Sequence, residues 1–274
     1  RTDVPWYNMV FESVVRDLNL KENSIIPLTT GAVAKHPDFP SMKSPGIPYK
    51  QMGYATKRDA VNDPNVLKEI RQKWYNIEAN IPCDLADVSC YGRAHLCSRN
   101  ENKIRATWGY PLEVYMAEGA YFYPLLEVLK SKESPFIAYG LEMANGGMAY
   151  INDMHLKNKI FPMLMGDWKK YDKRIPAWLI RDAFKIIEPA INFDKVQDSE
   201  GKLWSVRRNR SKRRWRALVN YFINTPIRLS NGERYIKHHG VPSGSCFTNI
   251  IDSVINMLII RCLVYEYTNE LPKG

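Results

Sequence analysis

The segment GDWKKYD, from Gly166 to Asp172, places two carboxylates five residues apart directly after an apolar run. Carboxylate oxygens are the ligands that Mg²⁺ prefers, so Asp167 could hold a metal ion while Asp172 lies beside a bound nucleotide. The spacing alone carries little weight, because 14 aspartates in 274 residues produce about 0.7 such pairs by chance. The chemistry of this pair therefore depends on what other segments bring to it.

A second polar pattern lies in GVPSGSCFTNIIDSVIN, where a glycine-bearing loop runs into an apolar helix-like segment. Thr248, Asp252 and Asn256 are four residues apart, which aligns them on one face of a helix. We call these three residues the polar stripe. Polar groups on a buried helix need hydrogen-bond partners. A substrate and internal hydrogen bonding are both open as the source of those partners.

The chain is basic, with 39 Lys and Arg against 29 Asp and Glu, a formal charge of +10 and a pI near 9.3. This balance favours a nucleic-acid partner, although a merely basic soluble protein has the same composition. Seven of the ten residues from Arg207 to Arg216 are basic. They could contact several phosphates or form a solvated face, and both interpretations remain open.

Four segments have the apolar period of a helix, and the 45% hydrophobic content allows a sizeable core. They are Trp6 to Leu18, Val66 to Ile77 behind Asp63-Pro64, Leu112 to Leu129, and Ala177 to Ile187 with Pro176 at the first helical position.

Strands are expected before Asp167 and before the second polar pattern. Ile160 to Gly166 is predicted as a short buried strand that runs into Asp167. Pro226 to Leu229 and Arg234 to Lys237 flank Asn231-Gly232, which favours a hairpin. Strand, acidic turn and helix thus follow in order around Asp167.

Cysteine spacing and hydropathy argue against a zinc site, a disulfide framework and a membrane span. Cys83, Cys90 and Cys97 are seven residues apart, which fits neither a CxxC zinc site nor a disulfide framework, so we expect reduced thiols. The most apolar stretch, Ile250 to Tyr265, is interrupted by Asp252, Asn256 and Arg261, so no membrane span is expected.

Four segments resemble the motifs of viral RNA-dependent RNA polymerases, most closely those of partitivirus-like double-stranded RNA viruses. GDWKKYD resembles motif A, and VPSGSCFTNIIDSVIN resembles motif B with its Ser-Gly loop. SPGIPY, at Ser44 to Tyr49, is similar to motif G, and NKIRATWGYP, at Asn102 to Pro111, is similar to the Lys-x-Arg end of motif F. The four occur in the order of the family, G, F, A and B.

The resemblance implies a role for each motif residue in phosphoryl transfer. Asp167 would be the catalytic carboxylate and a ligand of Mg²⁺, with Mn²⁺ as the alternative ion. Lys103 and Arg105 would steady the triphosphate of the nucleotide. Ser44 and Gly46 would let the template backbone approach closely, whereas the alternative is a simple Pro-Gly turn.

The nucleotide site would be completed by the Ser-Gly loop and the polar stripe. Ser243 and Gly244 would bind the nucleotide, and Asp172, Thr248 and Asp252 would sense the ribose 2′-hydroxyl that separates RNA from DNA precursors. Position 252 departs from the picornavirus-like pattern, which has Asn there. A second acid beside Asp172 would repel it, share a proton with it or turn away. The donor role expected at position 252 would then be lost, and Asn256 would compensate for it.

By the same resemblance we expect an α+β right-hand polymerase fold with fingers, an incomplete palm and no thumb. Residues 1–158 would form fingers with motifs G and F, and 159–187 palm with motif A. Residues 188–236 would form a fingers insertion, and 237–274 a truncated palm with motif B. No Gly-Asp-Asp occurs in the sequence, so we expect a fragment, cut at Arg1 and ending before motif C, that is inactive alone.

The implied activity is template-directed ribonucleotide transfer for viral genome replication and transcription. The partners would be RNA template and product, nucleoside triphosphates and a viral capsid protein, in the host cytoplasm or within the virion. A reverse transcriptase shares the motif A acid, but the Ser-Gly loop and Asp172 favour ribonucleotides. A non-enzymatic viral RNA-binding module would explain the charge but not the four ordered motifs.

Overall fold

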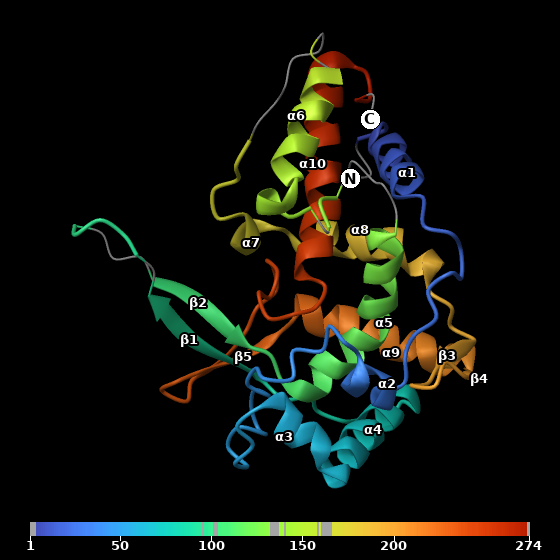
Figure 1. Cartoon of the computed structure of the whole chain (residues 1–274), viewed down its shortest axis with the longest axis vertical. Helices are drawn as coiled ribbons and strands as arrows, with labels where there is room; N and C mark the ends of the chain where they lie inside the picture. The colour runs from blue at the N-terminus through green and yellow to red at the C-terminus, as the bar shows by residue number, and fades with distance from the viewer. Residues whose placement is uncertain are drawn as a thin grey trace.

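The structure is a computed structural model that describes residues 4–94, 96–100, 104–131, 137–139, 141–157, 159 and 166–272 (Figure 1). Lys103 and the strand expected at 160–165 lie outside the described residues, so neither prediction is tested. Helices and strands both build the fold, which confirms a mixed architecture.

The helices and strands follow one another along the chain in a mixed order. The helices are α1 Tyr7–Leu18, α2 Thr30–Lys35, α3 Lys57–Asn62, α4 Pro64–Glu78, α5 Leu112–Lys130, η1 Met143–Asn145, α6 Gly147–Lys157, α7 Tyr171–Arg174, α8 Ala177–Ile187, η2 Glu188–Ala190, α9 Arg208–Ile223 and α10 Thr248–Thr268. The strands are β1 Val88–Ala94, β2 Ile104–Gly109, β3 Lys195–Gln197, β4 Leu203–Ser205, β5 Pro226–Leu229 and β6 Arg234–Ile236.

The four helices expected from apolar period are all present, as α1, α4, α5 and α8. Asp63 caps α4 by accepting a 2.8 Å hydrogen bond from the amide of Asn65, as the Asp-Pro start predicts. Pro176 is the N-cap of α8 and not its first helical residue, because its ψ of 149° is extended. The prediction for that helix start was wrong by one residue.

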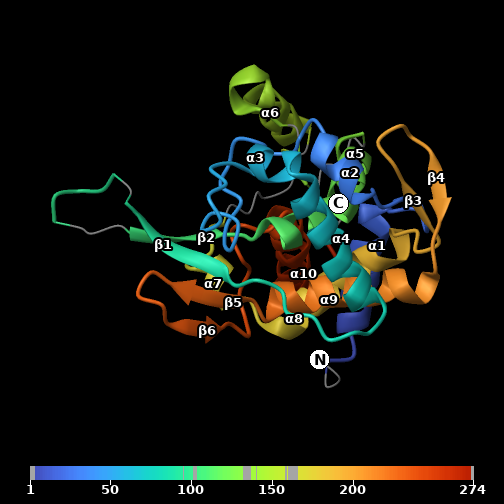
Figure 2. The same cartoon turned by 90° about the horizontal axis from the view of Figure 1, so that it is seen from below.

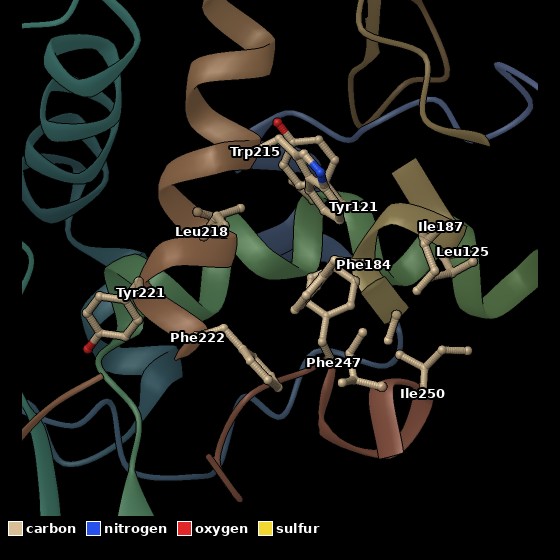
Figure 3. Packing of buried hydrophobic residues seen from close by; sticks show 14 of the residues in the cluster. Tyr121, Leu125, Phe184, Ile187, Trp215, Leu218, Tyr221, Phe222, Phe247 and Ile250 are labelled. Atoms are coloured by element: carbon tan, nitrogen blue, oxygen red, sulfur yellow. The ribbon is translucent and has the colours of Figure 1, made fainter. Parts of the chain in front are cut away.

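An aromatic cluster joins α8, α9 and the start of α10 (Figure 3). The rings of Phe184, Trp215 and Phe247 lie pairwise 5.5 to 5.8 Å apart with steep interplanar angles. All three side chains are buried, and such edge contacts add about 1 kcal/mol each beyond the burial of area. Since Phe247 immediately precedes α10, the cluster fixes where the polar stripe begins.

A four-stranded sheet in the order β2-β1-β5-β6 lies beside the helices. Strands β1 and β2 pair antiparallel, with Arg93 opposite Arg105, and β1 pairs parallel with β5. The β5–β6 hairpin around Asn231-Gly232 is confirmed, with Arg228 opposite Arg234. Figure 2 shows the far ends of β1 and β2 projecting away from the helical body.

Helix α10 is long and apolar enough to cross a membrane by length and composition alone, a property that core helices of soluble proteins share. In the structure it packs against α1 and α8. The guanidinium of Arg261 is buried and donates to Ser13 at 2.8 Å and to Asp17, both on α1. These contacts are typical of a core helix.

Candidate nucleotide site

The acidic turn, Gly166–Asp172, contacts the polar stripe of α10 through two aromatic side chains. The indole Nε1 of Trp168 donates a 2.7 Å hydrogen bond to Oδ1 of Asn256. The Tyr171 hydroxyl donates at 2.8 Å to the backbone carbonyl of Asp252. The two rings also stack, with centroids 6.2 Å apart. Segments that are more than 80 residues apart in the sequence therefore form one surface.

The Ser-Gly loop, Gly240–Phe247, is bonded to the end of the same turn. The amide of Val241 donates at 2.8 Å to the carbonyl of Asp172, and the amide of Gly240 donates at 2.7 Å to the carbonyl of Ile175. Gly240 has a φ of +74°, and a Cβ there would lie 2.6 Å from the carbonyl oxygen of Asp172. Only glycine fits this approach without strain.

Asp252 carries an unusual carboxyl group at the centre of this contact. Its Oδ1 is buried and has no hydrogen-bond partner in the described part of the chain. Burial, reinforced by the negative charge of Asp172, raises the pKa of Asp252 to about 7. Asp172 itself is exposed. The two predicted sugar-sensing acids are thus close enough to interact, and Asp252 offers an oxygen that a ligand could satisfy.

The other two members of the polar stripe already have internal partners. The Thr248 hydroxyl donates at 2.5 Å to the carbonyl of Pro242 and lies 3.2 Å from that of Ser245, so it closes the Ser-Gly loop. Asn256 accepts from Trp168. Internal hydrogen bonding therefore explains Thr248 and Asn256 in this structure, whereas it leaves one oxygen of Asp252 unexplained.

The end of β2 lies between the Ser-Gly loop and the Pro-Gly loop, Ser44–Tyr49. A Cβ on Gly244 would lie 2.5 Å from the carbonyl oxygen of Trp108. Gly46 has a φ of +72°, and a Cβ there would lie 2.6 Å from the carbonyl oxygen of Tyr110. The segments predicted as motifs G, F and B therefore meet within a few residues.

Side chains of these two loops differ in exposure. Ser44 accepts a weak 3.4 Å hydrogen bond from the amide of Gly46, which fits the simple turn interpretation as well as a template role. Ser243 is exposed at the tip of the Ser-Gly loop. Arg105 lies on β2, but the position of its side chain is outside the described structure. The contact of Arg105 with a triphosphate remains a prediction.

Comparisons with known proteins show which family the chain belongs to. Residues 10–273 match the family model of viral RNA-dependent RNA polymerase. The chain belongs to this polymerase family. It is similar to the RNA-directed RNA polymerase of Cryptosporidium parvum virus 1 (strain KSU-1), at 28% identity over 222 residues, or 80% of this chain and 38% of the relative. It is also similar to the RNA-directed RNA polymerase of Atkinsonella hypoxylon virus (isolate 2H), at 24% identity over 213 residues. That match covers 65% of this chain and 31% of the relative.

These matches confirm the resemblance to polymerases of partitivirus-like double-stranded RNA viruses. The chain spans about a third of the length of the two relatives. Polymerases of this family use divalent metals. Asp167 is an exposed carboxylate, the donor type that suits Mg²⁺, but among the described residues no three His, Cys, Asp or Glu side chains gather as a metal group. The role of Asp167 as a metal ligand stays a prediction.

Glu118 is a residue of this polymerase that sequence reasoning missed. It lies on α5, is almost fully buried, and accepts hydrogen bonds from Ser245 Oγ at 2.7 Å, the amide of Cys246 at 2.9 Å and the Tyr110 hydroxyl at 2.9 Å. Burial raises its pKa to about 7, and these three donors and the nearby Lys57 offset part of that rise. The sequence did hold one signal for a functional residue here, namely an acid within the apolar run from Leu112 to Leu129.

Lys237 supports the Ser-Gly loop from its other end. Its Nζ donates to the carbonyls of Phe222 and Ile223 at the end of α9, and to that of Gly240 at 2.8 Å. Burial lowers the pKa of Lys237 to about 7. Glu118 therefore joins the Ser-Gly loop to α5, and Lys237, which follows β6, joins it to the end of α9.

The basic run from Arg207 to Arg216 forms the first half of α9, and it is not simply a solvated face. Arg213 donates to the carbonyl of Glu78 at 2.6 Å, and Arg214 lies 3.2 Å from the Glu78 carboxylate. Arg208 pairs with Asp194 at 2.5 Å. Several of these cations thus attach α9 to neighbouring elements of the polymerase, which sequence alone did not indicate.

Proposed function

We propose that this chain forms the nucleotide-binding part of an enzyme that copies an RNA template into RNA. The observation that carries the proposal is the direct bonding of the acidic turn to the polar stripe and the Ser-Gly loop, through Trp168, Tyr171 and Asp172. Template-directed transfer needs a metal-binding acid and a sugar-sensing surface side by side. The contacts support that pairing.

In the proposed reaction the 3′-hydroxyl of the growing strand attacks the α-phosphorus of a nucleoside triphosphate, and pyrophosphate leaves. When bound, divalent magnesium ions would supply charge neutralisation for the attacking and leaving oxygens. Asp167 would provide a carboxylate oxygen to these ions, with Mn²⁺ as an alternative. Lys103 and Arg105 would hold the triphosphate in line with the attacking hydroxyl.

Ribose recognition would lie with the acid pair. At neutral pH about half of Asp252 is protonated, since its pKa is raised to about 7, and the neutral acid can donate to a 2′-hydroxyl. Asp172, which is exposed, would accept from that hydroxyl. Thr248 and Asn256 would act by fixing the loop and the turn, while Ser243 and Gly244 border the nucleotide.

The remaining assignments are part of the same proposal. Residues 1–158 and 188–236 would be fingers, and 159–187 and 237–274 would be palm. The Pro-Gly loop, with Ser44 and Gly46, would border the template. RNA and nucleoside triphosphates are the proposed partners, together with a viral capsid protein. The proposed location is the host cytoplasm or the virion.

Template and nucleotide assays on the complete polymerase that carries this sequence would test the reaction class. The proposal expects incorporation of ribonucleotides on an RNA template with magnesium. A preference for deoxyribonucleotides would favour a reverse transcriptase. RNA binding without incorporation on any template would favour the non-enzymatic module.

A further inference from the structure

A cavity of about 530 Å³ lies between α4, the β3–β4 hairpin and the first turns of α9. Figures 1 and 2 both place the β3–β4 hairpin on the opposite side of the molecule from α7, which carries the end of the acidic turn. None of the residues that line the cavity belongs to the candidate nucleotide site. Its volume falls within the range of about 300 to 1,000 Å³ typical of small-molecule sites.

The wall of this cavity is strongly cationic. Arg71 of α4 lines it together with Arg207, the N-cap of α9, and with Arg210 and Arg214 of α9. Glu78 is the one acid among the lining residues. Four guanidinium groups against one carboxylate leave a net positive charge. Like charges gathered around one cavity repel one another unless an anion is bound between them.

Two of these arginines lie over aromatic rings. The guanidinium of Arg210 lies 4.9 Å from the ring centre of Tyr75, and that of Arg214 lies 5.3 Å from the ring centre of Trp74. Nη1 of Arg214 lies 3.2 Å from the carboxylate of Glu78. The Nε of Arg214 is buried and has no hydrogen-bond partner among the described residues. A guanidinium that lies over an aromatic ring keeps its positive charge and its N–H donors, which match the oxygens of a phosphate.

The remaining wall combines hydroxyl and apolar groups. Thr29, Thr30 and Ser211 contribute hydroxyls, and Leu28 and Tyr121 contribute apolar surface. Helix α9 also begins here, with no side-chain cap on its first amides. The positive end of its dipole reinforces the attraction of the arginines for an anion.

We propose that this pocket binds the phosphate-bearing end of a nucleotide, from either a free nucleoside triphosphate or a 5′-phosphorylated RNA strand. Arginine forks match pairs of phosphate oxygens, and the apolar wall suits the base. The site is separate from the proposed catalytic one, so the inference stands independently of the assignment of Asp167.

Photolabelling with 8-azido-ATP, without divalent metal and followed by peptide mapping, locates the site in the complete polymerase. Label is expected on the peptide from residue 206 to 216. The double variant Arg71→Gln/Arg210→Gln should weaken 8-azido-ATP binding at least about tenfold, since it removes two charge-assisted contacts. Arg216→Gln is the matched control, because Arg216 is exposed on the same helix but does not line the cavity. Circular dichroism checks that each variant is folded.

Competition against the photolabel identifies the chemistry. ATP and a short 5′-triphosphorylated RNA should compete, and their order of potency tells which source the pocket prefers. Adenosine and the same RNA with a 5′-hydroxyl should compete at least tenfold more weakly. Arg105→Gln should leave this labelling unchanged. Label confined to β2 or α10, equal loss of binding in Arg216→Gln, or equal competition by unphosphorylated ligands would each overturn the proposal.

Discussion

The indole N–H of Trp168 donates a 2.7 Å hydrogen bond to the side-chain oxygen of Asn256. This bond joins the turn that carries Asp167 to the helix that carries Asp252. It uses only the amide oxygen of Asn256, and the amide nitrogen keeps its two N–H donors, so the prediction that Asn256 compensates at this site stays a prediction. In the proposed site, sugar recognition would depend on whether the carboxyl of Asp252 is protonated.

Discrimination between ribonucleotides and deoxyribonucleotides should depend on pH. Burial raises the pKa of Asp252 from 3.8 to about 7, so the group loses its donor proton as pH rises through 7. Between pH 6 and 8 the ratio of ribonucleotide to deoxyribonucleotide incorporation should fall roughly three- to fourfold. Most of the Asp252 carboxyl loses its proton over this range, and complete loss of one hydrogen bond of about 1 kcal/mol corresponds to roughly fivefold. Asp252→Asn keeps a donor and should remove the pH dependence, whereas Asp172→Ala should lower the ratio at every pH. A wild-type ratio that does not change with pH would contradict this role.

The free energy of unfolding should fall with rising pH because of Glu118. Its pKa is 4.5 when exposed and about 7 in the fold, where burial disfavours the charged form. As pH rises, the unfolded chain therefore releases this proton at a lower pH than the folded chain does. The free energy of unfolding then decreases between about pH 4.5 and 7. Relative to Glu118→Gln, the wild type should lose roughly 3 kcal/mol over this range. Urea unfolding measures it, with exposed Glu12→Gln as the control. Parallel curves for wild type and Glu118→Gln would show that the pKa of Glu118 is not raised.

Two glycines with positive φ allow the energetic cost of backbone strain to be measured apart from that of a steric clash. At Gly53 a Cβ would meet nothing within 4 Å, so Gly53→Ala should cost about 1 kcal/mol of strain. At Gly46 the added Cβ would lie 2.6 Å from the carbonyl oxygen of Tyr110, so Gly46→Ala should cost at least about 1 kcal/mol more. Chemical denaturation of both variants measures the difference. Equal costs would mean that the Pro-Gly loop does not pack tightly against the end of β2.

Arg105→Ala should weaken the use of all four nucleoside triphosphates. Removing the proposed clamp on the triphosphate should raise KM, lower kcat or do both, with a loss of about tenfold or more in kcat/KM. Arg93, which lies directly opposite Arg105 in the β1–β2 hairpin, provides the matched control. Steady-state incorporation kinetics that change equally in Arg93→Ala and Arg105→Ala would indicate a general effect of charge on RNA binding.

Local patterns predicted the helices well, because apolar period and capping act within a few residues. The apolar stripes of α1, α4, α5 and α8 and the Asn231-Gly232 turn all appear where expected. The motif order also predicted that the acidic turn and the polar stripe belong to one site. The shared surface of Trp168, Tyr171 and Asp252 is consistent with that expectation.

Contacts between distant residues could not be predicted from one sequence. Glu118 bonds to Ser245 across 127 positions, and Arg213 bonds to Glu78 across 135. Nothing local shows that a glutamate in an apolar helix will meet a loop amide, or that an arginine in a basic run will be half-buried. The internal use of the Thr248 hydroxyl likewise depends on the loop conformation that precedes it.

Magnesium-dependent incorporation by wild type, Asp167→Asn and the control Asp153→Asn tests the central claim most directly. Asp153 is also exposed, but it lies on α6, outside the acidic turn. In the complete polymerase, we expect Asp167→Asn to abolish templated ribonucleotide incorporation while RNA binding and thermal stability stay near wild type, because a metal-binding carboxylate is lost and little packing changes. Asp153→Asn should retain full activity. Robust incorporation by Asp167→Asn would contradict the assignment of Asp167 and, with it, the proposed site.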